Sequence, residues 1–159
     1  MSESDSAHGT PDPARIETEH ALTLDVECSP RVDVGPGPYG DRRVIPITGG
    51  SFAGPRLRGE IVSGGADWQL ARVDGVFEIE ARYTLRAEDG AYISIRNAGI
   101  LRGDDDGSAS GGYVRSVVQF EAPREGQHAW LNRSIFLGTL ALRSGPAPVN
   151  VRVHVYRVI

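Results

Sequence analysis

Two carboxylates and one guanidinium group lie close together in the chain, at Asp67, Glu80 and Arg82. Asp67 comes after the glycine pair Gly64-Gly65 and Ala66, and it precedes Trp68, whose ring would exclude water from the carboxyl group and raise its pKa, as suits a general acid or base. Glu80 and Arg82 are two positions apart, so they share one face of a strand. Arg82 could then hold a carboxylate or an enolate while Glu80 moves a proton.

Each of these residues also has a purely structural interpretation. Asp67 could accept backbone N–H groups in a glycine-rich turn, with Trp68 packed in the core. Glu80 and Arg82 could form an exposed ion pair worth less than about 1 kcal/mol. Both interpretations stay open at this point.

A second candidate set lies at Trp130 and Asn132. On a strand these two residues point the same way, so an aromatic ligand could stack on Trp130 and be hydrogen-bonded by Asn132. The alternative is a packed Trp130 and a turn closed by Asn132. Tyr83 and Tyr113 are candidate phenol donors, although Tyr on a strand more often serves packing.

The elements that must position these residues are strands. About ten strand-like runs follow one another, with hairpin signals such as Asp74-Gly75 and Asp89-Gly90 between them. Residues 77–85 alternate most clearly, with an apolar face and a charged face. The apolar face comprises Phe77, Ile79, Ala81, Tyr83 and Leu85, and the other face comprises Glu78, Glu80, Arg82, Thr84 and Arg86.

This pattern predicts an all-β, antiparallel fold. We expect a closed or nearly closed β-barrel rather than a sandwich, because closure removes unpaired edge strands and creates an interior. With roughly eight strands that interior can hold one small ligand. Alternation alone does not decide whether Glu80 and Arg82 face this interior or the solvent.

Length and composition predict one domain. Residues 1–15 are polar and small and are expected to form a disordered tail, whereas residues 16–159 form the barrel. Residues 103–112, rich in Gly, Asp and Ser, are expected to form a mobile loop.

Composition also excludes several functions. All 17 basic residues are Arg, so no lysine is present for a Schiff base or a phosphate-binding loop. The net charge of −4 argues against a nucleic-acid partner, since no basic surface is expected that could neutralise phosphates. The four histidines lack metal-ligand spacing and no cofactor motif occurs, so we expect neither a metal nor a cofactor.

The same composition suggests where the protein works. A single cysteine, Cys28, cannot form an intramolecular disulfide, and no export signal or membrane-spanning run is found. We therefore expect a cytoplasmic protein without a membrane partner, and leave homo-oligomer formation open.

Several long motifs, GGSFAGPRLRG, GGADWQLARVDG, EARYTLRAEDGAYISIRNAG and AWLNRSIFLG, resemble the bacterial domain-of-unknown-function family 3237 over residues 22–158. The resemblance implies a small β-barrel of the general lipocalin or streptavidin kind and no settled activity. Glu80 stands where the family usually has Asp. The segment from Gly99 to Tyr113 is shorter than usual. If it lies over the pocket, Tyr113 and Arg115 would contact the ligand and alter its size or identity.

Together these features predict a barrel that encloses a small organic molecule with an apolar or aromatic body and an anionic or carbonyl end. We expect cofactor-free proton transfer of the isomerase, cyclase or lyase type. Asp67 and Glu80 would be the acid and base, Arg82 would stabilise negative charge, and Trp68 and Trp130 would hold the ligand body. The alternatives are a carrier or sensor that uses the same pocket, and a barrel whose interior is filled by side chains.

Overall fold

The computed structural model of the chain describes residues 12–103, 112–143 and 149–159. Most of the predicted tail at residues 1–15 and of the predicted loop at residues 103–112 therefore lies outside the described residues. Within the described residues the chain forms nine strands and one short 3-10 helix. The elements are β1 (Thr18–Cys28), β2 (Val32–Gly37), β3 (Gly40–Ala53), β4 (Arg58–Ala71), β5 (Phe77–Ala87), β6 (Tyr92–Arg102), β7 (Tyr113–Glu121), η1 (Ala129–Arg133), β8 (Phe136–Arg143) and β9 (Val149–Val158).

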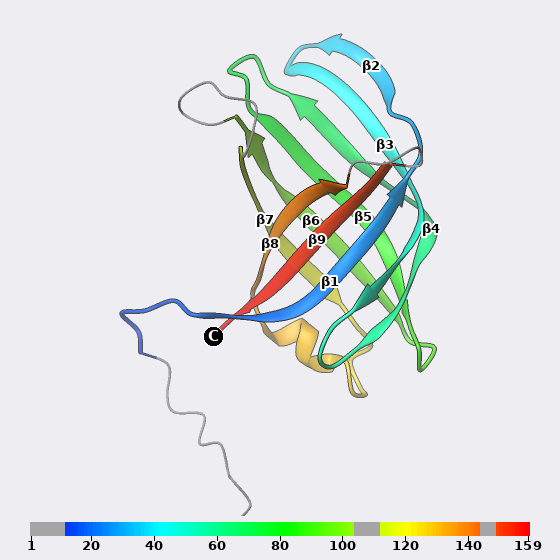
Figure 1. The fold of residues 1–159 in the computed structure, drawn as a ribbon, viewed down its shortest axis with the longest axis vertical. Helices are drawn as coiled ribbons and strands as arrows, with labels where there is room; N and C mark the ends of the chain where they lie inside the picture. Colours follow the sequence, from blue (N-terminus) through cyan, green and yellow to red (C-terminus); the bar gives the residue numbers. More distant parts are fainter. Residues whose placement is uncertain (1–11, 104–111, 144–148) are drawn as a thin grey trace, which may run out of the picture.

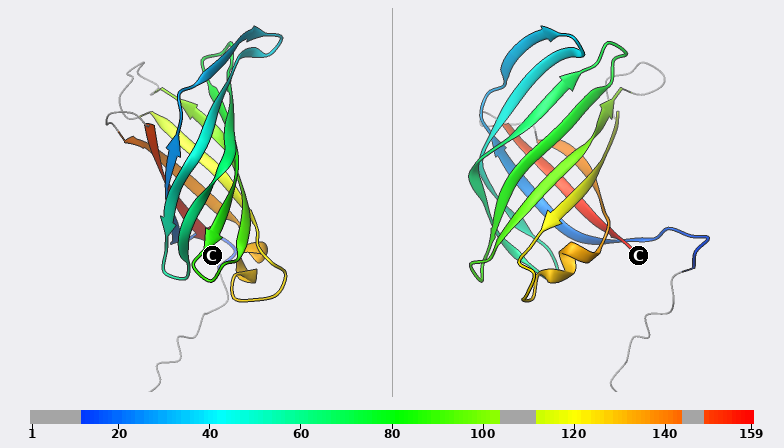
Figure 2. Two further views of the ribbon diagram at one scale, coloured as in Figure 1. Left: turned by 90° about the vertical axis from the view of Figure 1, so that its right-hand side faces the viewer. Right: turned by 180° about the vertical axis from the view of Figure 1, so that it is seen from behind.

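The strands close into an antiparallel barrel, as predicted. Their order is β1-β9-β8-β7-β6-β5-β4-β3-β2, and an additional pairing between β1 and the second half of β3 closes eight of the strands into a ring. The remaining strand, β2, pairs with the first half of β3 as a hairpin that extends beyond one end of the barrel (Figures 1 and 2). Closure satisfies the backbone groups that an open sheet would leave at its edges.

A bulge in β4 sets the surroundings of Asp67. The strand β4 runs through Gly64 and Gly65 without interruption. Its register with β5 shifts between Val62 and Ala66, so the glycine pair is accommodated as a bulge. Gly64 has φ +119°, and a Cβ on Gly65 would lie 2.6 Å from Cβ of Tyr83. Glycine is needed here because any larger residue would collide with the Tyr83 strand.

One end of the barrel is packed and capped. Fully buried side chains such as Leu22, Leu85, Ile93 and Phe136 fill the interior there. The helix η1 lies across this end (Figure 1), with Leu131 buried against the core. Trp130 and Asn132, which were expected to lie on a strand, thus lie in a 3-10 helix instead. In the described residues no helix is both long and apolar enough to cross a membrane.

Candidate functional site

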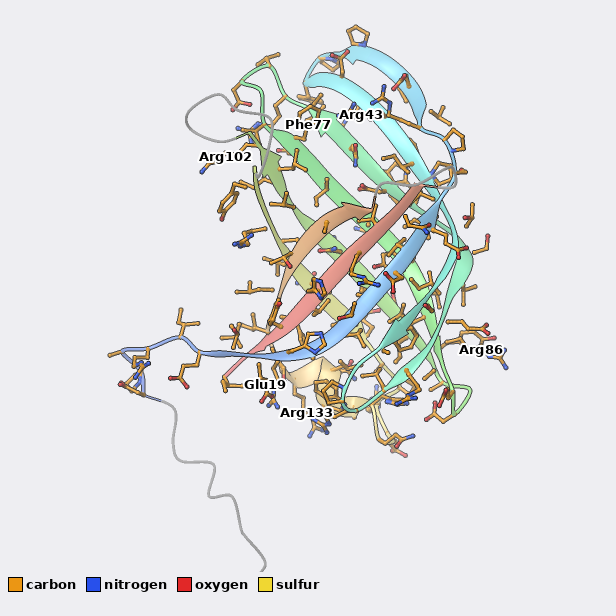
Figure 3. The ribbon with its side chains drawn as sticks, in the orientation of Figure 1. Glu19, Arg43, Phe77, Arg86, Arg102 and Arg133 are labelled. Carbon is orange, nitrogen blue, oxygen red and sulfur yellow. The ribbon has the colours of Figure 1, made fainter. Side chains whose placement is uncertain are left out.

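The other end of the barrel contains a cavity of about 590 Å³. This volume falls in the range of roughly 300–1,000 Å³ that is typical of small-molecule sites. Most of its wall is aliphatic. The polar or ionisable residues on the wall are Cys28, Arg31, Arg43, Asp67, Gln69, Tyr83 and Asn97. Figure 3 places Arg43 and Phe77, which both border the cavity, near the end from which the β2–β3 hairpin extends, and Arg133 of η1 at the opposite end.

Asp67 lies on the inner wall, as one interpretation of the sequence required. Its carboxylate accepts a hydrogen bond from Nε2 of Gln69 at 2.7 Å and one from the backbone N–H of Glu80 at 3.0 Å. Burial raises the pKa of Asp67 above its usual value, although the two hydrogen bonds and the charge of Arg43 oppose that shift. The wall therefore carries a fixed, desolvated carboxyl group, which is the environment of a general acid or base.

Tyr83 and Cys28 border the same cavity and remain protonated at neutral pH. Burial raises the pKa of Tyr83, and negative charge on Cys28 or Asp67 would raise it further. Burial also raises the pKa of the Cys28 thiol to about 11, with a contribution from Asp67. The Tyr83 hydroxyl is buried and has no hydrogen-bond partner among the described residues. Tyr83 is thus a neutral phenol donor, whereas Cys28 is a poor nucleophile.

Several wall residues were missed by the sequence reasoning. Arg43 shares the inner face of β3 with Ile45 and Ile47, and Asn97 shares the inner face of β6 with Ile93 and Ile95. The signal that could have identified both is a polar residue on the apolar face of an alternating strand. Such a residue is costly to bury unless it has a partner or a ligand.

Glu80 and Arg82 lie on the outer face of the barrel, so the structure does not bring them together with Asp67 inside it. Arg82 donates to Glu80 at 3.2 Å and Nε of Arg96 donates to the same carboxylate at 3.1 Å. The side chains of Glu80 and Arg82 are 41% and 61% exposed. The inner face of β5 is its apolar face, so the prediction that these two charges line the interior is corrected. Glu80 contributes to the site only through its backbone N–H.

Trp68 is also on the outside and is 46% exposed, because it follows Asp67 directly and strand side chains alternate. It therefore cannot be the wall that desolvates Asp67. Tyr113 is 41% exposed, with the guanidinium groups of Arg102 and Arg115 over its ring. Tyr113 and Arg115 do not border the cavity, whereas Val114 between them does.

Trp130 and Asn132 lie at the capped end, away from the cavity wall. The Trp130 ring packs edge-on against Phe136, with the Arg56 guanidinium 4.0 Å from its centroid. The Asn132 side chain bonds to the backbone N–H and C=O of Ala122. The packing interpretation of this pair therefore fits the structure. The ligand-binding interpretation is corrected, because the two residues do not share a strand face.

The described residues contain no group of three or more His, Cys, Asp and Glu side chains arranged to hold a metal ion. Fold and site together define a β-barrel protein with one apolar internal cavity and a carboxyl, a phenol and a guanidinium group on its wall.

This chain belongs to the family described as Protein of unknown function (DUF3237), whose model matches residues 16–158. The resemblance seen in the sequence is thus confirmed. A relative called UPF0311 protein from Clostridium acetobutylicum is 33% identical over 129 residues, covering 75% of this chain and 78% of that protein.

Several solved structures share the fold. A conserved protein of unknown function from Rhodopseudomonas palustris is 29% identical, with a TM-score of 0.81 over 94% of this chain and 100% of that chain. A beta-barrel like protein from Acinetobacter baumannii has the same identity, TM-score and coverage. An enzyme from Penicillium herquei is 19% identical with a TM-score of 0.66, covering 92% of this chain and 98% of that chain. At that identity the likeness concerns the fold alone.

Proposed function

We propose that this barrel binds a small organic molecule with an apolar or aromatic body and catalyses cofactor-free proton transfer on it. The observation that carries the proposal is the Asp67 carboxyl group, held on the wall of an apolar cavity by Gln69 and by the N–H of Glu80. A carboxyl group desolvated in this way holds its proton more tightly, which brings its basicity closer to that needed at neutral pH.

The chemistry follows from the positions of Asp67 and Tyr83. As a carboxylate, Asp67 removes a proton from the carbon next to a ligand carbonyl. The C–H bond breaks, an O–H bond forms on Asp67, and the electron pair passes to the carbonyl oxygen. The Tyr83 hydroxyl, which is buried without a partner among the described residues, turns towards that oxygen and donates a hydrogen bond to it as it gains negative charge. If the ligand carries a C=C bond next to that carbon, the electron pair is shared with it, and Asp67 returns the proton at the far carbon of that bond, which is an isomerisation. If the next carbon carries a leaving group instead, the enolate electron pair forms a C=C bond and expels that group, which is an elimination.

Phe77, Ile79 and the other apolar wall residues hold the body of the ligand and exclude water. The phenol of Tyr83 suits its role because burial keeps it neutral, so that it can donate throughout the neutral range. Neither step uses the side chain of Glu80 or of Arg82. We also propose a cytoplasmic location, which is supported by the single, buried, reduced Cys28.

The test is deuterium exchange at the benzylic C–H beside the ketone of β-tetralone, followed by proton NMR in D2O. The wild-type protein should accelerate this exchange. Asp67→Asn should lose roughly 10²- to 10⁴-fold of the acceleration and Tyr83→Phe roughly 10²-fold. Glu60→Gln is the matched control, because Glu60 is an exposed carboxylate on the same strand, and it should exchange at the wild-type rate.

Full acceleration in Asp67→Asn would refute the assignment of the base. Saturable binding of β-tetralone without accelerated exchange would instead favour a carrier or sensor that uses the same cavity. Absence of both binding and exchange would favour a barrel without a ligand.

A further inference from the structure

The cavity wall carries an arginine, Arg43, that forms no hydrogen bond or ion pair with any described residue. The nitrogen Nε is buried as well. The cavity wall contains one more described arginine, Arg31. Its charge is neutralised by an ion pair with Asp33 at 2.8 Å.

Several other partly buried arginines have carboxylate partners, whereas other described arginines that lack one, such as Arg42 and Arg86, are exposed. Arg152 is held by both carboxylate oxygens of Asp25 at 2.8 and 3.2 Å, and Arg72, Arg82 and Arg96 all contact carboxylates on the outer surface. A partly desolvated guanidinium group without a counter-ion is destabilising unless something else supplies the negative charge. Asp67 interacts with Arg43 electrostatically but does not form an ion pair with it.

Phe77 fixes the orientation of this cation. The guanidinium carbon of Arg43 lies 4.6 Å from the centroid of the Phe77 ring, which is a cation–π contact. The N–H groups of a guanidinium lie in its plane, so the Phe77 ring covers its face and not its edges. Because Nε is buried, the edge left for a ligand is the one formed by the two terminal nitrogens. That edge matches the two oxygens of a carboxylate. Figure 3 shows Arg43 and Phe77 close together near the open end of the barrel.

We propose that Arg43, stacked on Phe77, is the anchor for the carboxylate of a planar aromatic acid whose ring lies in the apolar cavity. The inference rests on the proposed function, because it names the class of ligand that occupies the same cavity. The carboxylate neutralises the one unpaired cation of the described wall, and the aliphatic side chains take up the ring. A polyphosphate or other multiply charged anion is a poorer match, because one guanidinium group cannot neutralise it and Asp67 adds negative charge when ionised.

The anchor also sets the direction of the ligand. Arg43 and Gln69 pair across β3 and β4, and Ile45 pairs with Asp67 two residues further along β3. An acid held by Arg43 therefore projects its body along the wall towards Asp67. A carbonyl or acidic C–H group one or two bonds beyond the ring would then meet the carboxyl group that the proposed function requires.

The test compares trans-cinnamate with its neutral amide, cinnamide, by isothermal titration calorimetry on the full-length protein. Wild-type protein should bind cinnamate roughly 10- to 100-fold more tightly than cinnamide, as expected for charge-assisted hydrogen bonds. Arg43→Gln should reduce this preference to near unity. Arg42→Gln is the matched control, because Arg42 is the exposed neighbour on the same strand and pairs with Leu70 rather than with a wall residue. It should keep the wild-type preference.

Two further variants test whether the geometry of Arg43, and not only its charge, sets the preference for the acid. Arg43→Lys keeps the charge but loses the two-pronged geometry, and Phe77→Leu keeps the charge but loses the ring. Each should reduce the preference several-fold while circular dichroism shows a folded barrel. Equal affinity of wild-type protein for acid and amide, an unchanged preference in Arg43→Gln, or no binding of either probe at about 1 mM would each overturn the proposal.

Asp67→Asn separates this inference from the proposed function. If the anchor is right, Asp67→Asn keeps the preference for cinnamate, whether or not Asp67 is the catalytic base. If the proposed base is wrong, exchange of β-tetralone survives in Asp67→Asn while the preference at Arg43 is unaffected. Loss of the acid preference in Asp67→Asn would overturn the anchor.

Discussion

Leu24 and Leu140 offer a matched test of whether the barrel is hollow near β8. Both pair with Val153, Leu24 from β1 and Leu140 from β8. Leu24 is fully buried in the packed core, whereas Leu140 is partly buried and borders the cavity. The same substitution at the two positions therefore removes the same atoms from two different environments.

The expected costs differ for a physical reason. Leu→Ala removes three carbons, worth about 2.4 kcal/mol at about 0.8 kcal/mol each, and leaves a new void if the surroundings are packed. Leu24→Ala should thus lower the free energy of unfolding by about 3–5 kcal/mol. At Leu140 the void already exists and part of the side chain already faces it, so Leu140→Ala should cost only about 1–2 kcal/mol.

Urea unfolding followed by circular dichroism measures both changes, and the dependence on urea should stay the same in the two variants. Cinnamate titration provides a second readout, because only Leu140→Ala enlarges the site. Equal losses of about 3 kcal/mol or more at both positions would refute the reasoning, since they would mean that side chains fill the barrel at Leu140 as they do at Leu24.

Three further predictions concern individual side chains. Tyr83→Phe should raise the free energy of unfolding by about 1 kcal/mol in urea, because the hydroxyl that it removes is buried without a partner. Glu80→Gln should cost less than about 1 kcal/mol and leave exchange of β-tetralone unchanged, because its carboxylate meets only exposed Arg82 and Arg96. Burial raises the pKa of Asp67 in the folded state, so its contribution to stability should fall as pH rises from the ordinary Asp pKa of 3.8 through the raised value. Urea unfolding of wild-type protein and Asp67→Asn across that window should show this slope only in the wild type.

The barrel could be predicted from local signals, because alternating residues and turn dipeptides mark most of its strands. Alternation in residues 77–85 and the turns at Asp74-Gly75 and Asp89-Gly90 all correspond to features of the structure. The expectation that Trp130 and Asn132 lie on a strand was wrong, however, because this segment forms η1. The polar groups of Asn132 find partners on Ala122, which lies ten residues earlier in the chain, and no local pattern announces such a contact.

The site could be predicted only in part. Asp67 was identified, but the residues that accompany it inside the barrel come from strands far apart in the sequence, such as Cys28 on β1 and Asn97 on β6. The alternation of β5 divides its residues into two faces without indicating which face is internal. Which face of β5 is internal depends on all the strands of the barrel together, because their inner faces must form the apolar core that packs one end. This places Glu80 and Arg82 outside.

The most direct measurement is an NMR titration of the Asp67 carboxyl carbon, without ligand and with saturating cinnamate. We expect the pKa of Asp67 to lie above the ordinary value of 3.8 in the free protein. We expect it to rise further with cinnamate, because the bound carboxylate places negative charge in the same cavity and neutralises Arg43. A pKa at or below the ordinary value that cinnamate leaves unmoved would contradict the claim that Asp67 and the ligand share one desolvated cavity.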